Sequence, residues 1–168
     1  VIITSEMETF FDLCPCRIYG VTGSDGKTTT TTLISEMLAK TGRRVYKGGN
    51  IGKALLPLIE TIREEDAAVV ELSSFQLISM RRSPDVAVIT NISPNHLDVH
   101  GTMEEYIGCK VNLIAHQNAY SKTVLNLDNA QTAALAEQVR GRLLWFTRQQ
   151  KPERGTFLDA EGWLCYAE

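Results

Sequence analysis

Short apolar runs alternate along the chain with stretches in which apolar residues recur at helical spacing. The runs predict strands at residues 17–22, 44–47, 67–72, 86–90, 123–127 and 143–147. The helical stretches predict helices at residues 28–41, 54–63, 74–82, 102–117 and 130–140. Strictly alternating strands and helices form crossover units, so the pattern predicts an α/β fold with a mostly parallel sheet and helices on both of its faces.

The two ends of the sequence depart from this alternation. Residues 4–14 predict a short helix ahead of the first strand, and residues 156–166 predict a small antiparallel hairpin around a Glu-Gly turn. The chain begins without Met and stops two residues after the hairpin. We therefore expect residues 1–16 to be the remnant of a preceding domain or linker and residues 17–168 to form one central domain.

Composition and charge narrow the class of protein. A chain of 168 residues with 43% hydrophobic and 22% charged residues is typical of one globular domain. The net charge of −3 and the lack of a long basic run disfavour a nucleic-acid partner. No apolar run approaches the length of a membrane span and the N-terminus lacks a signal-peptide pattern, so we expect no membrane partner and a cytoplasmic protein.

The four cysteines do not form a recognised motif. Cys14, Cys16, Cys109 and Cys165 match neither a zinc knuckle nor a CxxC redox pair. We expect all four to be reduced packing residues, as in a reducing compartment.

A Gly-rich loop separates the first predicted strand from an amphipathic helix that carries Leu33, Ile34, Met37 and Leu38 on one face. Such a loop suits phosphate, because glycines let backbone N–H groups approach the oxygens and the helix N-terminus contributes partial positive charge. Lys27 adds a full positive charge, and Thr28 can hold Mg²⁺. Val21 stands where the usual G-x4-G-K-S/T pattern has its first glycine. The residues that we expect to bind phosphate here are Gly23, Ser24, Asp25, Gly26, Lys27, Thr28 and Thr29.

Two further loops follow the carboxyl ends of predicted strands, where ligands bind in such sheets. Glu71 ends a buried run and is either a Mg²⁺ ligand or a solvated carboxylate. His96 lies in the loop after residues 86–90 and is either a ligand or a structural histidine, whereas His116 falls near a helix end.

Lys110 interrupts an apolar stripe. Tyr106, Ile107, Leu113 and Ile114 lie three or four residues from it along the predicted helix. The lysine can extend outward to water. If it is desolvated instead, its pKa falls and a neutral amine becomes available for covalent modification. The sequence leaves both alternatives open.

The order and spacing of these motifs resemble the central ATP-binding domain of the Mur ligase superfamily, over nearly the whole chain. The matching motifs are Thr22-Gly-Ser-Asp-Gly-Lys-Thr28, Gly48-Gly-Asn-Ile-Gly52, Glu71-Leu-Ser-Ser-Phe-Gln-Leu77, Thr90-Asn-Ile with His96-Leu-Asp98, His100 through Lys110, and Leu125-Asn-Leu-Asp128. Within the superfamily, the second and third motifs resemble the branch that adds D-glutamate. Members of that branch also lack the leading glycine of the first motif, as this chain does at Val21. The resemblance implies a P-loop NTPase-like fold.

The resemblance implies a role for each site residue. Lys27 would contact the β- and γ-phosphates, and Thr28 and Glu71 would hold a first Mg²⁺. His96 aligns with a ligand of a second Mg²⁺, and Lys110 with a lysine that family members carry as a carbamate. The remaining matches are Asn50 and Ser73 near the muramoyl substrate and Asn126 at the adenine, while Asn95 departs from the Asp that the family commonly has.

The reaction implied is an ATP-dependent amide ligation. The carboxylate of UDP-N-acetylmuramoyl-L-alanine would form an acyl phosphate, which the amine of D-glutamate then displaces, in peptidoglycan precursor synthesis. Lys27, Glu71, His96 and Lys110 would be the catalytic residues. The family's domains for the uridine nucleotide and the incoming amino acid would flank this chain, and we expect a monomer. The alternatives are another superfamily branch, a folylpolyglutamate synthetase-like protein, or an isolated nucleotide-binding module without turnover.

Overall fold

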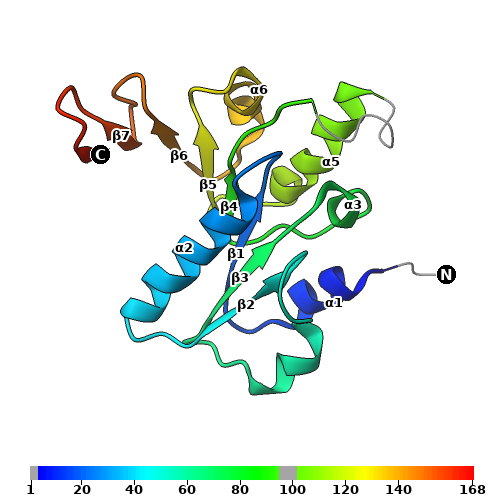
Figure 1. Cartoon of the computed structure of the whole chain (residues 1–168). Coiled ribbons are helices and arrows are strands. Elements are labelled where there is room, and N and C mark those ends of the chain that lie inside the picture. The colour runs from blue at the N-terminus through cyan, green and yellow to red at the C-terminus, as the bar shows by residue number, and fades with distance from the viewer. Residues whose placement is uncertain (1–3, 95–101) are drawn as a thin grey trace.

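A computed structural model describes residues 4–94 and 102–168. Eight strands form one sheet in the order β2-β3-β1-β4-β5-β6-β7-β8 (Figure 1). The strands are β1 (Arg17–Thr22), β2 (Val45–Gly49), β3 (Ala67–Glu71), β4 (Val86–Ile89), β5 (Lys122–Asn126), β6 (Arg142–Thr147), β7 (Gly155–Leu158) and β8 (Leu164–Ala167). Every pair in this order is parallel except β7 and β8, which form an antiparallel hairpin. The predicted mostly parallel sheet and its C-terminal hairpin are both confirmed.

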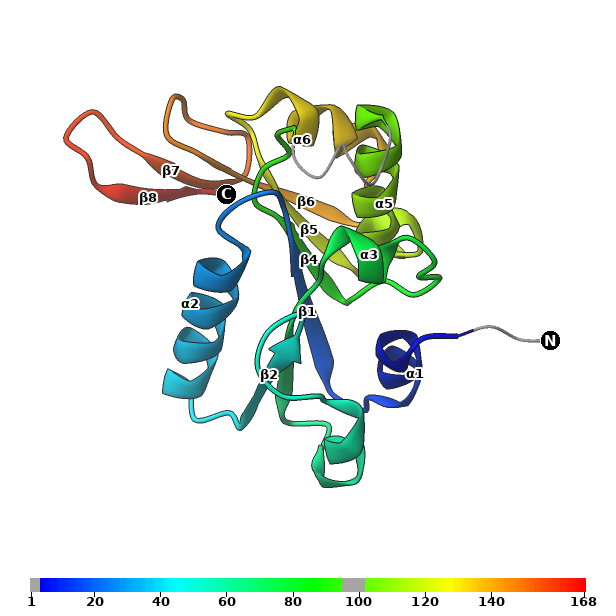
Figure 2. The same cartoon turned by 45° about the vertical axis from the view of Figure 1, so that its right-hand side comes forward.

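Helices cover both faces of the sheet. The helical segments are α1 (Glu6–Leu13), α2 (Lys27–Lys40), the 3-10 turn η1 (Leu56–Thr61), α3 (Ser74–Leu77), α5 (Met103–Ala115), α6 (Ala130–Ala134) and the 3-10 turn η2 (Leu135–Gln138). Figure 2 shows α2 on one side of the sheet and α1, α3 and α5 on the other. None of the helices within residues 4–94 and 102–168 has the length and apolar character needed to cross a membrane.

The core lies around the central strands. All five residues of β3 are buried, which fits the run Ala-Ala-Val-Val and a strand covered on both faces. Phe10 of α1, Leu72, Leu77 of α3 and Leu113 of α5 are fully buried in the same apolar cluster. The loops that follow the carboxyl ends of β1, β3 and β4 therefore start from buried strand ends.

Three predicted helices are shorter or tighter than expected. The helix predicted at 74–82 ends at Leu77, where the Asn112 side chain donates to the Leu77 carbonyl at 2.8 Å and Pro84 then prevents further helix. The helix predicted at 54–63 is a 3-10 turn with Pro57 near its start. The helix predicted at 130–140 changes to 3-10 geometry after Ala134.

The apolar stripe expected on α2 is not its buried face. Leu33 is 56% exposed and Met37 is 62% exposed. The buried residues of α2 are Thr31 and Ser35, and the Ser35 hydroxyl donates to the Thr31 carbonyl at 2.7 Å. Ile34 and Leu38 of the expected stripe are half-buried, so the positions of α2 that are fully covered carry small polar side chains.

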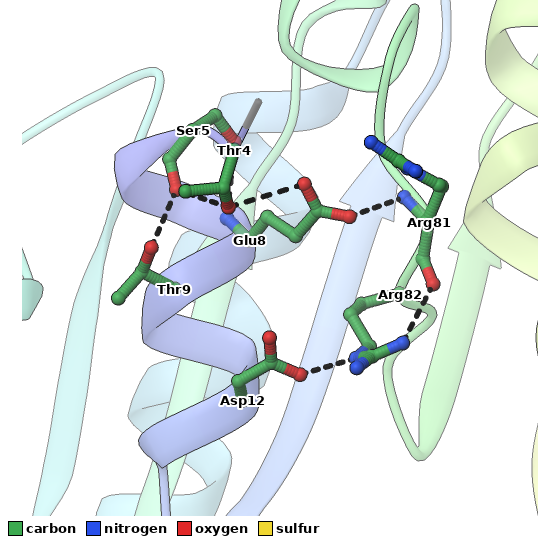
Figure 3. Close-up of polar contacts among 7 residues, drawn as sticks. All are labelled: Thr4, Ser5, Glu8, Thr9, Asp12, Arg81 and Arg82. Atoms are coloured by element: carbon green, nitrogen blue, oxygen red, sulfur yellow. Dashed lines mark hydrogen bonds and ion pairs between the residues drawn. The ribbon is translucent and has the colours of Figure 1, made fainter. Parts of the chain in front are cut away.

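Helix α1 is fastened to the segment that follows α3 (Figure 3). The Glu8 carboxylate is buried and accepts hydrogen bonds from the Arg81 backbone N–H at 2.9 Å and from the Thr4 hydroxyl at 3.3 Å. Asp12 forms an ion pair with the Arg82 guanidinium (Figure 3). Because Glu8 satisfies an N–H that no helix or strand uses, residues 4–13 belong to the folded unit.

Candidate phosphate and metal site

The loop between β1 and α2 is held in place by the segment after β4. The Ser24 N–H donates to the Asn91 carbonyl, and the Asp25 N–H donates to the Asn91 side-chain oxygen, each at 2.9 Å. The Thr90 hydroxyl donates to the Asp25 carbonyl at 2.7 Å. A Cβ on Gly23, whose φ is +153°, would overlap that same hydroxyl. Only glycine therefore allows the loop to lie this close to β4.

The loop ends at the N-terminus of α2, where a phosphate would be expected to bind. Gly26 caps the helix in the left-handed conformation at φ +77° and has no side chain to accept from the first-turn N–H groups. Lys27 Nζ donates to the carbonyl oxygens of Gly23 and Ser24 at 3.0 and 2.9 Å. Backbone N–H groups, a helix N-terminus and an ammonium thus belong to one loop, and these are the groups that bind phosphate.

Glu71 lies beside this loop, at the end of β3. Its carboxylate accepts from the Thr28 hydroxyl at 2.8 Å and from the Asn50 side-chain amide at 3.0 Å. The side chain is 1% exposed, so the alternative of a solvated carboxylate is wrong. A Cβ on Gly49 would overlap the Glu71 carbonyl, which explains why glycine ends β2 where it approaches β3.

Lys110 is buried rather than extended to water. Its side chain is 1% exposed, and Nζ donates to the Gly23 carbonyl at 3.0 Å. The ammonium also lies 4.5 Å from the centre of the Tyr106 ring. Burial, with a smaller contribution from the positive charge of Lys27, lowers the pKa of Lys110 to about 8. Of the two alternatives that the sequence left open, the desolvated amine is confirmed.

Six of the predicted site residues line one small cavity of about 160 Å³. Its lining consists of Gly23, Ser24, Lys27, Asn50, Ser73, Ser74, Phe75, Tyr106 and Lys110. Tyr106 is a site residue that sequence reasoning assigned only to an apolar stripe. Its hydroxyl lies 3.1 Å from the Ser24 hydroxyl, and burial raises its pKa. Its place one helical turn before Lys110 was the available signal.

Ser73 and Asn126 have structural partners of their own. The Ser73 hydroxyl accepts from the Gln76 N–H and belongs to a capping box that begins α3. The Asn126 amide donates to the Thr90 carbonyl at 3.0 Å. This bond links β5 to the segment that holds the loop between β1 and α2, residues 23–28, which we call the phosphate loop. Asn126 lines a second cavity, of about 650 Å³, between the end of β5 and the β7–β8 hairpin.

The oxygen donors present suit Mg²⁺. Thr28 and Glu71 supply a hydroxyl and a carboxylate, and Mg²⁺ completes such a set with phosphate oxygens and water. Among the described residues, no three His, Cys, Asp or Glu side chains gather into a metal site formed by protein alone. His96 and Asn95 lie outside the described residues. His116 is the C-cap of α5, in agreement with its predicted place near a helix end.

Comparison with models of protein families assigns the chain to one of them. The model of the Mur ligase middle domain matches residues 21–157. The chain belongs to that family. Among its Mur ligase relatives, the UDP-N-acetylmuramoylalanine–D-glutamate ligase of Acetivibrio thermocellus is 54% identical over 93% of the chain and 34% of the relative. The ligase of the same name from Clostridium acetobutylicum is 49% identical over 98% of the chain and 36% of the relative.

Solved structures share the fold of this chain. The Mur ligase middle domain described here matches the MurF ligase of Thermotoga maritima, solved with ADP, with a TM-score of 0.66 and 26% identity, over 99% of the chain and 42% of the other protein. FolC of Escherichia coli shares the fold, with a TM-score of 0.64 and 15% identity over 94% of the chain and 50% of that protein. The chain spans about a third of the length of its curated relatives.

Proposed function

We propose that this Mur ligase middle domain binds Mg-ATP for a ligase that adds D-glutamate to UDP-N-acetylmuramoyl-L-alanine. The observation that carries the proposal is the Thr28–Glu71 contact beside Lys27, at the N-terminus of α2. The names of the two ligases that are 54% and 49% identical support the choice of D-glutamate over the amino acids that other Mur ligases add.

The phosphate loop orients the nucleotide. Lys27 Nζ exchanges its two carbonyl partners for oxygens of the β- and γ-phosphates, while the first N–H groups of α2 donate to the same phosphates. Thr28 and Glu71 would hold Mg²⁺, which supplies charge neutralisation for the γ-phosphate as it is transferred. Asn50, already bonded to Glu71 at 3.0 Å, fixes the position of that carboxylate.

The transfer itself needs positioning more than covalent chemistry. The substrate carboxylate attacks the γ-phosphate of ATP, ADP leaves, and an acyl phosphate forms. The amine of D-glutamate then displaces phosphate to give the amide. Asn50 and Ser73, which line the small cavity beside Lys27, are the proposed contacts to the muramoyl substrate, and Asn126 is the proposed contact to adenine.

Lys110 is proposed to act as a carbamate. Because burial lowers its pKa to about 8, a useful fraction of the amine is neutral near physiological pH. The ammonium first loses a proton. The neutral Nζ then adds to CO₂, an N–C bond forms and a second proton is released, so that a buried cation becomes an anion. That anion and His96 would hold a second Mg²⁺. The Gly23 carbonyl, 3.0 Å from Nζ, places this group next to the phosphate loop.

The uridine nucleotide and the incoming amino acid need surfaces beyond this domain, because the chain spans about a third of its relatives' length. A domain that binds ATP without turnover by itself is the second candidate. We expect the 168-residue chain alone to bind Mg-ATP and to form no amide product, because its reactants lose the positioning advantage of several kcal/mol. The intact protein should form the product.

Calorimetric titration with Mg-ATP tests the binding step. Lys27→Ala removes the ammonium and should weaken affinity at least about tenfold, the equivalent of a hydrogen bond to a charged group at about 1.5–3 kcal/mol. Lys40→Ala, at the exposed opposite end of α2, is the matched control and should leave affinity unchanged. Equal affinities for Lys27→Ala and wild type would contradict the phosphate-loop assignment.

A further inference from the structure

Two thiols face each other in the short linker between α1 and β1. Cys14 is the C-cap of α1, and its N–H donates to the Phe10 carbonyl at 2.9 Å. Cys16 directly precedes β1, and the two Sγ atoms lie 3.6 Å apart. Pro15 between them has its φ angle fixed by the ring. The linker therefore holds two sulfur atoms in contact before any bond joins them.

The thiol pair opens onto a cavity far from the nucleotide site. This cavity, of about 960 Å³, is lined by residues that precede β1, β2, β3 and β4, so it lies at the amino ends of the strands. The phosphate loop follows the carboxyl end of β1. Cys14 is partly exposed, whereas Cys16 is 5% exposed. A small molecule in the cavity would thus meet Cys14 first.

The charges around the cavity have both signs. Arg17 and Arg44 line it together with Asp66 and Asp85. A zwitterionic peptide, which carries ammonium and carboxylate groups, finds partners for both in such a lining. The chemistry therefore favours a small peptide disulfide of the glutathione type as the reactant for the thiols.

We propose that Cys14 and Cys16 are a dithiol site that a glutathione-type disulfide oxidises to an intramolecular disulfide. The Cys14 thiolate attacks one sulfur of the reagent, an S–S bond forms to Cys14, and one thiolate of the reagent leaves and takes up a proton. Cys16 then loses its proton and attacks Cys14 Sγ, which releases the second thiol. Two protein thiols are oxidised and one disulfide is reduced, so electrons and protons balance.

The order of attack follows from the environments of the two sulfurs. The hydrogen bond from Cys16 lowers the pKa of Cys14, against smaller opposing effects of burial and Asp85. The same hydrogen bond and the negative charge of Cys14 raise the pKa of Cys16, and burial raises it further. Once Cys14 is in the mixed disulfide it carries no negative charge and no longer accepts the hydrogen bond of the Cys16 thiol, so neither effect raises the pKa of Cys16. Cys16 then becomes easier to deprotonate at the step where it must act.

Peptide mapping after native incubation with oxidised glutathione tests the site. Trypsin cleaves after Arg17, so one peptide carries Cys14 and Cys16 and neither Cys109 nor Cys165. The protein is incubated folded, the remaining thiols are alkylated at low pH, and the peptides are weighed. Wild type should yield that peptide with two hydrogens lost and no alkyl group. Cys16→Ser should instead retain glutathione on Cys14, because the second step is removed.

Cys165 is the internal reference, because it is a half-buried free thiol whose pKa is raised by burial and by Asp159. A serine hydroxyl can donate to Cys14 Sγ as the Cys16 thiol does, so we expect Cys14 in Cys16→Ser to react at least about tenfold faster than Cys165. Reaction of Cys14 at or below the rate of Cys165, or a wild-type peptide that still takes two alkyl groups, would overturn the proposal.

A trivalent arsenical provides a second measurement without oxidation. Phenylarsine oxide condenses with two thiols and releases water, so it captures only sulfurs that lie close together. It should protect Cys14 and Cys16 of the folded protein from alkylation and leave Cys165 unprotected. This test uses the unaltered protein, so a folding defect of a variant cannot explain its result. Absence of protection would contradict the proposed dithiol site.

Discussion

The Thr28 hydroxyl donates a hydrogen bond of 2.8 Å to the Glu71 carboxylate, across 43 residues of sequence. The register of the sheet produces this contact, because Glu71 pairs with Val21 on the neighbouring parallel strand. The phosphate loop begins two residues after Val21 and returns over the end of β3 as α2 starts. A buried carboxylate and a hydroxyl, both oxygen donors, are thereby placed beside the ammonium of Lys27.

Glu71→Gln should weaken Mg-ATP binding at least about tenfold, because an amide of the same shape removes the charge that a divalent cation needs. Binding of metal-free ATP, measured by calorimetry in the presence of a chelator, should be unchanged or tighter. Glu64→Gln, on an exposed residue at the opposite end of the sheet, is the control and should change neither value. An equal loss with and without Mg²⁺ would mean that Glu71 only supports the fold.

Gly23→Ala should lower the free energy of unfolding by more than about 2 kcal/mol, because the new Cβ overlaps the Thr90 hydroxyl and φ is +153°. Gly108→Ala is the matched control, since a Cβ there meets nothing within 4 Å. It lies within α5 and should raise stability by about 0.5–1 kcal/mol. Urea unfolding midpoints for the two variants decide the matter, and equal midpoints would refute the argument.

The sequence predicted the sheet and the phosphate loop because both rest on local patterns. Apolar runs marked the strands, and glycines followed by Lys27 marked the loop. Lys110 is different, because its periodicity placed it within an apolar stripe but did not reveal whether Nζ reached water. The answer depends on the Gly23 carbonyl and the Tyr106 ring, which come within reach of Nζ only in the folded chain.

Helices α2 and α3 show where pattern reasoning fails. The spacing of Leu33 and Met37 predicted one apolar face, but it did not reveal that both side chains are exposed and that the smaller Thr31 and Ser35 are buried. Helix packing depends on the shape of the partner surface, which no single segment encodes. Likewise, where α3 ends, the Leu77 carbonyl accepts from the Met80 N–H and from the Asn112 side chain, which belongs to a helix 35 residues later. Such tertiary partners are invisible to local periodicity.

Lys110 should make stability rise with pH. Its pKa is lowered from 10.5 to about 8 in the folded state, so between these values the unfolded chain binds more protons and alkali favours folding. The difference in unfolding free energy between wild type and Lys110→Met should therefore increase by up to about 3 kcal/mol from pH 8 to 10.5. It should stay flat below that window. Urea titrations in CO₂-free buffer check this, and a flat difference throughout would show a hydrated amine.

Lys110→Ala in the intact protein should reduce kcat far more than it changes affinity for Mg-ATP. The proposed carbamate contributes its charge as the acyl phosphate forms, so its loss affects the transition state more than the bound nucleotide. Lys122→Ala, which removes an exposed lysine at the start of β5, is the control and should leave kcat unchanged.

Rescue by small carboxylates separates the carbamate from a purely structural lysine. Acetate and formate are smaller than the lysine side chain that Lys110→Ala removes beside Gly23 and Tyr106, and they would restore the anion without restoring that side chain. Part of the lost kcat should return as carboxylate is added to Lys110→Ala, while wild type should not respond. A structural lysine predicts no such recovery, because a small anion cannot replace its hydrogen bond to the Gly23 carbonyl. Full activity of Lys110→Ala without any additive would refute the proposed role of the amine.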